Sequence, residues 1–157
     1  MSDSTAQRTL AAQRIVIDAS ALIAASISSK GASRELYRLA TEGRVVLILC
    51  DYTIHEVRYN LKKQNYTRAL IWFDISLAAL QYEHAPNPSR NKVKRSLSLI
   101  KDDPNDVPYL VLAKETGADY IVAFDHHLLD LGQYSLKDRQ ILIMKPGDCL
   151  KIIRAAF

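Results

Sequence analysis

Four short apolar runs, separated by segments with helical character, constrain the fold of this chain more than any other feature. They cover Arg14–Asp18, Arg44–Cys50, Asp119–Phe124 and Gln140–Met144, and all four contain β-branched residues. Runs of this length indicate strands, and a nearly continuous apolar run such as VVLIL is typical of a strand buried on both faces of a parallel sheet. We therefore predict a three-layer α/β/α fold with a mainly parallel central sheet and right-handed crossovers.

The segments between these runs carry helix signals. In chain order, the predicted helices are residues 21–28, Ser33–Glu42, a helix from about Thr53, Thr67–Tyr82, Val107–Thr116 and Pro146–Arg154. Gly43 and Gly117 follow two of them as helix stops, and Thr53 and Glu56 have the spacing of a capping box. Residues 84–101 contain two prolines and many basic residues, so the sequence leaves open whether they form a basic helix or a loop.

The length of 157 residues favours one domain with its own core. We expect a flexible tail over residues 1–13 and a single domain over residues 14–157. Cys50 and Cys149 each lie in or beside an apolar run, so no disulfide framework is expected and a reducing cytoplasm fits the composition. Because neither a secretory signal nor an apolar segment of membrane-spanning length is recognised, we expect a soluble cytoplasmic protein that makes no membrane contact.

Missing motifs exclude several common types of site. The five glycines, at positions 31, 43, 117, 132 and 147, are too far apart for a P-loop or a dinucleotide-binding turn. The chain has no G-x-S-x-G, C-x-x-C or H-E-x-x-H pattern, so the sequence gives no motif evidence for a serine hydrolase or a zinc site.

Four carboxylates occupy equivalent positions in the predicted α/β pattern. Asp18 and Asp125 end strands, Glu56 lies in the helix after the second strand, and Asp106 begins a later helix. The carboxyl ends of parallel strands and the first turns of the following helices meet at one edge of a sheet, so the four can converge there. Their mutual repulsion would favour a bound cation, and such oxygen ligands suit Mg²⁺ or Mn²⁺. Taken singly, each acid is better explained as a helix-start residue, so the metal site is a hypothesis about the set.

The net charge of +4 is unevenly distributed, with two stretches in which nearly all charged residues are basic. The candidate RNA-binding residues in them are Arg58, Lys62, Lys63, Arg90, Lys92, Lys94 and Arg95. Clustered lysine and arginine gain affinity for nucleic acid by releasing its counterions, and Tyr59 or Tyr66 could stack on bases. A solvated helix face is the alternative, and it is the more frequent explanation for any one of these residues.

The order and spacing of several motifs resemble the PIN-domain family. The motifs are VIDASALI near the start, IHEV in the middle, DPNDVPYLVLAKETGADYIVAFDHHLLDL and, near the end, KPGDCL. The likeness extends over nearly the whole chain from Arg14 onward and is strongest to bacterial and archaeal PIN toxins of toxin–antitoxin pairs, of the VapC type. It implies a parallel sheet flanked by helices and a Mg²⁺- or Mn²⁺-dependent nuclease centre that acts on RNA. A homodimer and a small antitoxin are the partners that it implies.

The family's acidic positions fall on Asp18, Glu56, Asp106 and Asp125 of this chain. The resemblance implies that Asp18, Asp106 and Asp125 bind the metal, and that Glu56 completes the ligand set or holds the attacking water. Ser20 falls on a small polar position of the family and would orient Asp18 or a metal-bound water. The leading prediction is therefore a metal-dependent endoribonuclease that hydrolyses RNA phosphodiester bonds, as the toxin of a toxin–antitoxin pair.

Two departures from the family pattern keep alternatives open. Ala123 stands where many members carry threonine or serine, and Asp103 is an extra acid that fits a turn beside Pro104 or an outer role at the metal. The second hypothesis, prompted by Ala123 and the basic stretches, is a catalytically weak or inactive PIN-like module that binds RNA or protein. The third is a phosphatase or other small-molecule hydrolase built on the same four acids. His126 and His127 are expected to be surface or groove residues, because adjacent positions of one element point in different directions.

Overall fold

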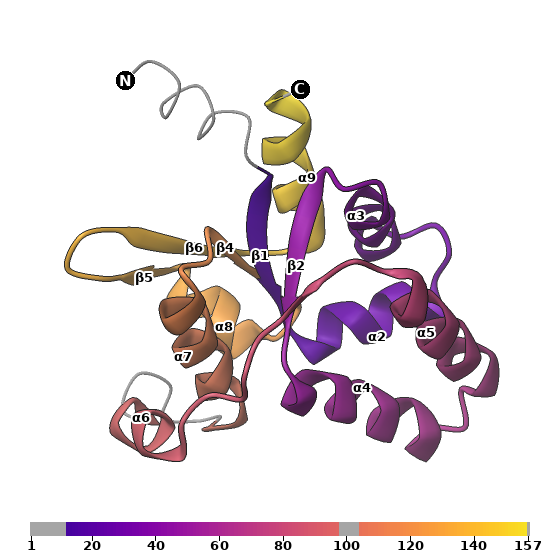
Figure 1. The fold of residues 1–157 in the computed structure, drawn as a ribbon, viewed down its shortest axis with the longest axis horizontal. Helices are drawn as coiled ribbons and strands as arrows, with labels where there is room; N and C mark the ends of the chain where they lie inside the picture. The colour runs from indigo at the N-terminus through magenta and orange to yellow at the C-terminus, as the bar shows by residue number, and fades with distance from the viewer. Residues whose placement is uncertain (1–11, 98–103, 157) are drawn as a thin grey trace.

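Six strands form one sheet in the computed structural model, which describes residues 12–97 and 104–156 (Figure 1). In sequence order they are β1 (Gln13–Ile17), β2 (Val45–Leu49), β3 (Glu83–His84), β4 (Tyr120–Val122), β5 (Gln133–Ser135) and β6 (Gln140–Met144). Their order across the sheet is β3-β2-β1-β4-β6-β5, and every neighbouring pair is parallel except β5 with β6. The predicted mainly parallel sheet is confirmed.

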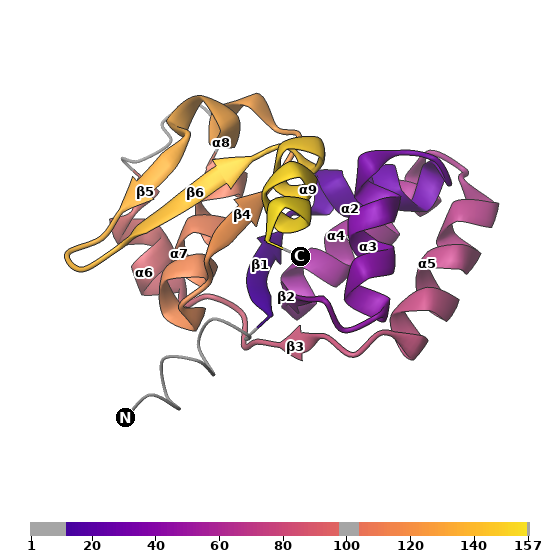
Figure 2. The same cartoon turned by 90° about the horizontal axis from the view of Figure 1, so that it is seen from above.

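Helices cover both faces of the sheet, as a three-layer fold requires. They are α2 (Ala19–Ile27), α3 (Ala32–Thr41), α4 (Asp51–Lys63), α5 (Thr67–Ala79), α6 (Arg90–Arg95), α7 (Val107–Thr116), α8 (His126–Leu131) and α9 (Pro146–Ala155), with a 3₁₀ turn, η2, at Pro104–Asp106. Ile15 and Ile17 of β1 pack in a core with α2, α3, α4, α5 and α9, whereas Val16 packs with α7 and α8 on the other face. Figure 2 shows α2 to α5 on one side of β1 and β2, with α6 and α7 on the other side.

The start of α4 differs from the sequence prediction. The helix begins at Asp51 with Cys50 as its N-cap residue, so the predicted capping box of Thr53 and Glu56 is wrong. Thr53 is fully buried in the first turn, where its hydroxyl lies 3.5 Å from the sulfur of Cys50. Thr53 is therefore a buried residue within the first turn and not the cap of this helix, which leaves the Glu56 side chain available for other contacts.

Other helix boundaries show which signals were strong. The α7 helix spans the predicted residues 107–116, and Gly117 ends it with a left-handed φ of 72°. The α5 helix stops at Ala79, three residues short of the prediction, because the chain turns extended at Leu80 and enters β3. Residues 90–95 form a helix, whereas β3, β5 and α8 are short elements that the sequence patterns did not reveal.

The described residues allow a partial comparison with the expectations about the N-terminal tail, the cysteines and the membrane. Of the predicted tail, residues 1–11 lie outside the described residues, and Gln13 already belongs to β1. Cys50 and Cys149 are both buried free thiols. Among the helices in the described ranges, none combines the length and the apolar character needed to cross a bilayer.

Candidate functional site

The four predicted acids line one pocket at the carboxyl edge of the sheet. Asp18 directly follows β1 and Asp125 lies three residues after β4, and these strands pair in parallel with Ile17 beside Val122. Glu56 projects from α4, which follows the adjacent strand β2, and Asp106 stands at the start of α7. The pocket has a volume of about 210 Å³. Its other lining residues are Ala19, Ser20, Ile23, Asn60, Asn105 and Tyr109.

Asp18 is the most buried of these acids, with 2% of its surface exposed. Its carboxylate caps α2 by accepting a hydrogen bond from the backbone N–H of Ala21 at 3.0 Å, and it accepts another from the hydroxyl of Ser20 at 2.7 Å. Burial raises the pKa of Asp18 to about 7; these hydrogen bonds oppose the rise, and the charges of Asp125 and Glu56 add to it. An acid with such a pKa is partly protonated near neutral pH in the absence of a cation.

Asp106 and Asp125 are in contact through their carboxyl groups. Asp125 also caps α8 by accepting a hydrogen bond from the backbone N–H of His127 at 2.8 Å. Partial burial alone would raise the pKa of Asp125, but the hydrogen bonds with Asp106 and His127 and the charges of both neighbouring histidines lower it overall. Two carboxyl groups in hydrogen-bond contact need a proton or a cation between them, which makes this pair a natural place for a positive ion.

Glu56 is held by a residue that the sequence patterns missed. The hydroxyl of Tyr109 donates a hydrogen bond to Oε2 of Glu56 at 2.7 Å. Tyr109 lies one turn after Asp106 on α7, as Asn60 lies one turn after Glu56 on α4. Positions three or four residues apart share a helix face, so this spacing was the available signal for both residues.

The donor set fits a hard divalent cation. Carboxylates converge in a small pocket, two of them touch, and the most buried one has a pKa raised to about 7 by burial and neighbouring charge. Asn60 and Asn105 line the same pocket and add amide oxygens. Oxygen ligands of this kind suit Mg²⁺ or Mn²⁺, which keep part of their water shell when they bind to proteins.

Comparison with known proteins adds to this geometry. A family model described as PIN domain matches residues 14–127. The chain belongs to the PIN domain family. PIN domains are generally nucleases, so membership supports a nuclease-type function in general terms.

Two solved structures are similar to this PIN domain. The crystal structure of PAE2754 from Pyrobaculum aerophilum has a TM-score of 0.66 at 21% identity, with 92% of this chain and 91% of that chain covered. VapC20 from Mycobacterium tuberculosis, described as a toxin that cleaves the sarcin–ricin loop, has a TM-score of 0.49 at 17% identity, with coverage of 71% and 89%. A search of curated proteins found no match. The first likeness supports the fold of the PIN domain.

The two histidines after Asp125 lie at the surface as expected, with His126 exposed and His127 partly buried, but their rings lie close together. The ring centroids of His126 and His127 are 4.0 Å apart, and Nδ1 of His127 lies 3.3 Å from the Asp125 carboxylate. Ligand atoms of the three residues lie within 4.8 Å of one another. The two side chains therefore do not diverge as expected, because both belong to the first turn of α8, where the N-cap carboxylate turns back towards them.

The seven predicted RNA-binding residues are exposed and lie on α4 and α6, and none lines the acidic pocket. Figure 1 shows these two helices on either side of the carboxyl ends of β1 and β2. Arg58 forms an ion pair with Asp74 at 2.7 Å, which ties α4 to α5. Asp103, the additional acid singled out in the sequence, lies outside the described residues.

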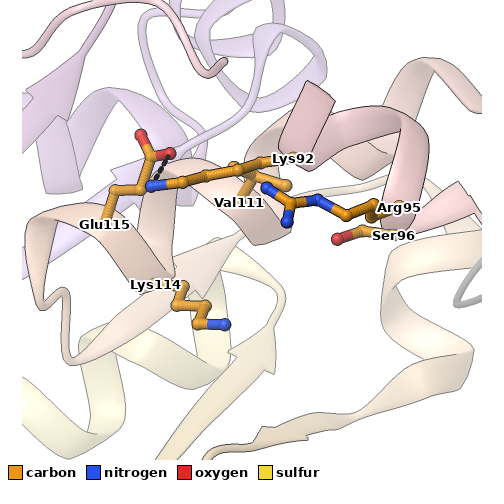
Figure 3. Close-up of a pocket in the computed structure, with 6 residues that line it drawn as sticks. All are labelled: Lys92, Arg95, Ser96, Val111, Lys114 and Glu115. Atoms are coloured by element: carbon orange, nitrogen blue, oxygen red, sulfur yellow. Dashed lines mark ion pairs between the residues drawn. The ribbon is translucent and has the colours of Figure 1, made fainter. Parts of the chain in front are cut away.

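The basic side chains of α6 border a second, larger pocket. It has a volume of about 500 Å³ and is lined by Lys92, Arg95, Ser96, Val111, Lys114 and Glu115. Figure 3 shows Lys92 reaching from α6 to Glu115 on α7, where the ammonium and the carboxylate lie 3.1 Å apart. Lys92 is thus partly neutralised, while the guanidinium of Arg95 lies beside it at the same pocket (Figure 3).

Proposed function

We propose that this PIN domain is a Mg²⁺- or Mn²⁺-dependent endoribonuclease that hydrolyses RNA phosphodiester bonds. The observation that carries the proposal is the convergence of Asp18, Glu56, Asp106 and Asp125 in one pocket, with Asp18 almost fully buried. Carboxylates in such a place are costly without a cation, and family membership supports a nuclease function.

We assign the metal to Asp18, Asp106 and Asp125. A divalent ion bound there supplies Lewis acidity towards a phosphoryl oxygen and lowers the pKa of a bound water. Ser20 orients Asp18 by donating a hydrogen bond to its carboxylate. Glu56 holds the attacking water or completes the ligand set, and Asp103 is assigned an outer role at the metal.

RNA is the proposed substrate, and the basic residues of α4 and α6 would contact its backbone on either side of the pocket. Lys62 and Lys63 lie at the end of α4, and Lys94 and Arg95 at the end of α6. Lysine and arginine at such positions attract phosphates without reading sequence. The exposed ring of Tyr59 on α4 could stack on a base.

We further propose that the protein is the toxin of a toxin–antitoxin pair, with a separate antitoxin and a second copy of this chain as partners. The α5 helix supports the dimer, because Ile71 and Ile75 lie one turn apart and are 54% and 68% exposed. Apolar side chains grouped on an exposed helix face favour contact with another protein surface. The antitoxin rests on the family resemblance alone.

Substitution of two acids tests the proposed nuclease. Asp18→Asn and Asp106→Asn keep the side-chain shape and should each lower Mn²⁺-dependent RNA cleavage by about 1,000-fold or more, since a catalytic metal supplies several kcal/mol. Asp138→Asn, an exposed aspartate outside the acidic pocket, is the matched control and should cleave as the wild type does. Thermal melting of all three variants checks that they are folded.

Cleavage by these variants, together with binding and hydrolysis assays of the wild type, separates the alternatives. Full cleavage by both variants would exclude this site. RNA binding by the wild type without cleavage under any divalent ion, and without stabilisation by Mn²⁺, would favour the catalytically inactive binding module, for which Ala123 and the basic stretches are the sequence arguments. Hydrolysis of a small phosphomonoester with RNA left intact would favour the small-molecule hydrolase.

A further inference from the structure

Tyr109 is the residue of the acidic pocket whose contacts extend furthest. It lies in α7, three residues after Asp106, and is 2% exposed. Its hydroxyl oxygen lies 2.7 Å from Oε2 of Glu56 and 3.2 Å from the backbone nitrogen of Ala19. One buried phenol therefore joins α7, α4 and the start of α2 around the four carboxylates.

Chemistry fixes the direction of both hydrogen bonds. Ala19 is the first residue of α2, so its N–H has no acceptor within the helix and donates to the phenol oxygen of Tyr109. The phenol proton is then left for Glu56, whose Oε2 accepts it. Burial, together with the charges of Glu56 and Asp18, raises the pKa of Tyr109 far above its ordinary value, so the phenol keeps this proton.

This bond engages one oxygen of Glu56 and leaves the other to the pocket. Within the described part of the chain, no hydrogen bond or ion pair to Oε1 is found, although Glu56 lines the pocket. A glutamate has three rotatable side-chain bonds, so without an anchor it samples many positions. An anchored carboxylate among other acids presents its second oxygen in one orientation, which is the condition for effective positioning of a water or a cation.

We propose that Tyr109 is the positioning residue for Glu56: by holding Oε2, it fixes the orientation in which Oε1 would hold the attacking water or complete the ligand set of a bound cation. This inference rests on the proposed nuclease function. Tyr109 itself need not touch the substrate, because its effect passes through Glu56. Removing the Tyr109 hydroxyl should therefore lower catalysis only when the Glu56 carboxylate is present.

A double-mutant cycle of Tyr109→Phe and Glu56→Gln tests this coupling. Tyr109→Phe should lower kcat for Mn²⁺-dependent RNA cleavage by about 10- to 100-fold, the usual effect of losing a hydrogen bond to a charged group, with KM changed by less than about threefold. In the Glu56→Gln background the same substitution should change kcat by less than about twofold. Wild-type kcat in Tyr109→Phe, or effects of the two substitutions that multiply, would overturn the proposal.

Mn²⁺ binding provides a second cycle that needs no turnover. Calorimetric titration should show weaker Mn²⁺ binding by about threefold or more in Tyr109→Phe, and no further weakening when it is added to Glu56→Gln. If the wild type cleaves no RNA, the proposed nuclease fails, and this cycle alone decides the role of Tyr109: absence of coupling would overturn it.

Tyr37→Phe is the matched control for a structural effect. Tyr37 is also a buried tyrosine, but it packs on Trp72, with ring centroids 5.1 Å apart, and it does not line the acidic pocket. Tyr37→Phe should retain wild-type kcat and Mn²⁺ affinity. If Tyr37→Phe and Tyr109→Phe reduced kcat equally, the effect of Tyr109 would be a matter of packing and the proposal would be overturned.

Discussion

The hydroxyl of Ser20 lies 2.7 and 2.9 Å from the two carboxylate oxygens of Asp18. The same hydroxyl accepts a hydrogen bond from the backbone N–H of Phe124 at 3.1 Å, one residue before Asp125. One small side chain in the first turn of α2 thus joins the segments that carry the first and the last acid of the pocket, and the bond between Ser20 and Phe124 spans 104 positions of the chain.

Ser20→Ala should weaken Mn²⁺ binding by about 10- to 100-fold, because groups that orient metal ligands have effects of this size. It also removes a hydrogen bond that lowers the pKa of Asp18, so the carboxyl would hold its proton more strongly against the metal. Ser20→Thr keeps the hydroxyl and should bind nearly as well as the wild type. Calorimetric titration with Mn²⁺ measures both variants, and equal affinity of the alanine variant and the wild type would contradict the prediction.

The contribution of Asp18 to the stability of the metal-free protein should fall as the pH rises from about 4 to about 7. Burial raises the pKa of Asp18 from its ordinary value of 3.8 to about 7 in the folded protein. A folded-state pKa above the unfolded value gives stability that is complete below the unfolded pKa and is lost as the pH rises through the folded one. This rise in pKa corresponds to a contribution to the free energy of unfolding of about 4 kcal/mol at most, because each pKa unit is worth about 1.36 kcal/mol.

Urea unfolding with a chelator present, for the wild type and for Asp18→Asn, isolates this contribution. Asparagine does not titrate, so the difference between the two free energies of unfolding should change between pH 4 and pH 7 and level off above that range. If the free energies of unfolding of the two proteins changed with pH in parallel, the pKa of Asp18 would not be raised by folding and the prediction would be wrong. At pH 7, added Mn²⁺ should stabilise the wild type and release protons, because the metal competes with the proton on Asp18.

Gly117→Ala should destabilise the protein by about 1 kcal/mol or more. Gly117 ends α7 at a φ of 72°, where a side chain strains the backbone. Gly147 is the control, because it lies inside α9 and an added Cβ would meet only the Cβ of Ala32, at an ordinary contact distance of 3.9 Å. Gly147→Ala should be neutral or stabilising in urea unfolding, and an equal loss in both variants would refute the conformational explanation.

Lys63→Ala and Lys94→Ala should each raise KM for RNA and reduce the salt dependence of RNA binding by about one unit of slope, because each removes one phosphate contact. Lys151→Ala removes a charge on α9 that is also exposed, and it serves as the control. Binding of a fluorescent RNA across a salt series measures the slopes. If all three variants kept the wild-type slope, the basic residues of α4 and α6 would be solvated helix faces.

Much of the architecture followed from local patterns in the sequence. Apolar β-branched runs marked β1, β2, β4 and β6, and the α7 helix was predicted to the residue because Gly117 supplies an unambiguous stop. The runs buried on both faces pointed to parallel pairing, and parallel pairing placed four acids at one edge. Signals of this kind act over a few residues and are readable in the chain itself.

Elements that depend on distant partners were not readable in this way. The two-residue strand β3 exists through its pairing with β2, and β5 through its antiparallel pairing with β6. The capping box at Thr53 failed because the helix begins two residues earlier, at Asp51, and Thr53 is buried in its first turn. The side chains of His126 and His127 were expected to point in different directions because they are adjacent in the chain. In the first turn of α8 their rings lie together instead.

The sequence by itself determined the layered α/β frame and the four carboxylates, because residue periodicity, helix stops and the ends of apolar runs are local properties. Only the tertiary structure decided which groups surround those carboxylates: the Ser20 hydroxyl between Asp18 and Phe124, and the phenol of Tyr109 on Glu56. Tyr109 and Glu56 are 53 positions apart. A hydrogen bond over that separation exists only when two helices pack at a particular distance and rotation, and no local pattern encodes that geometry.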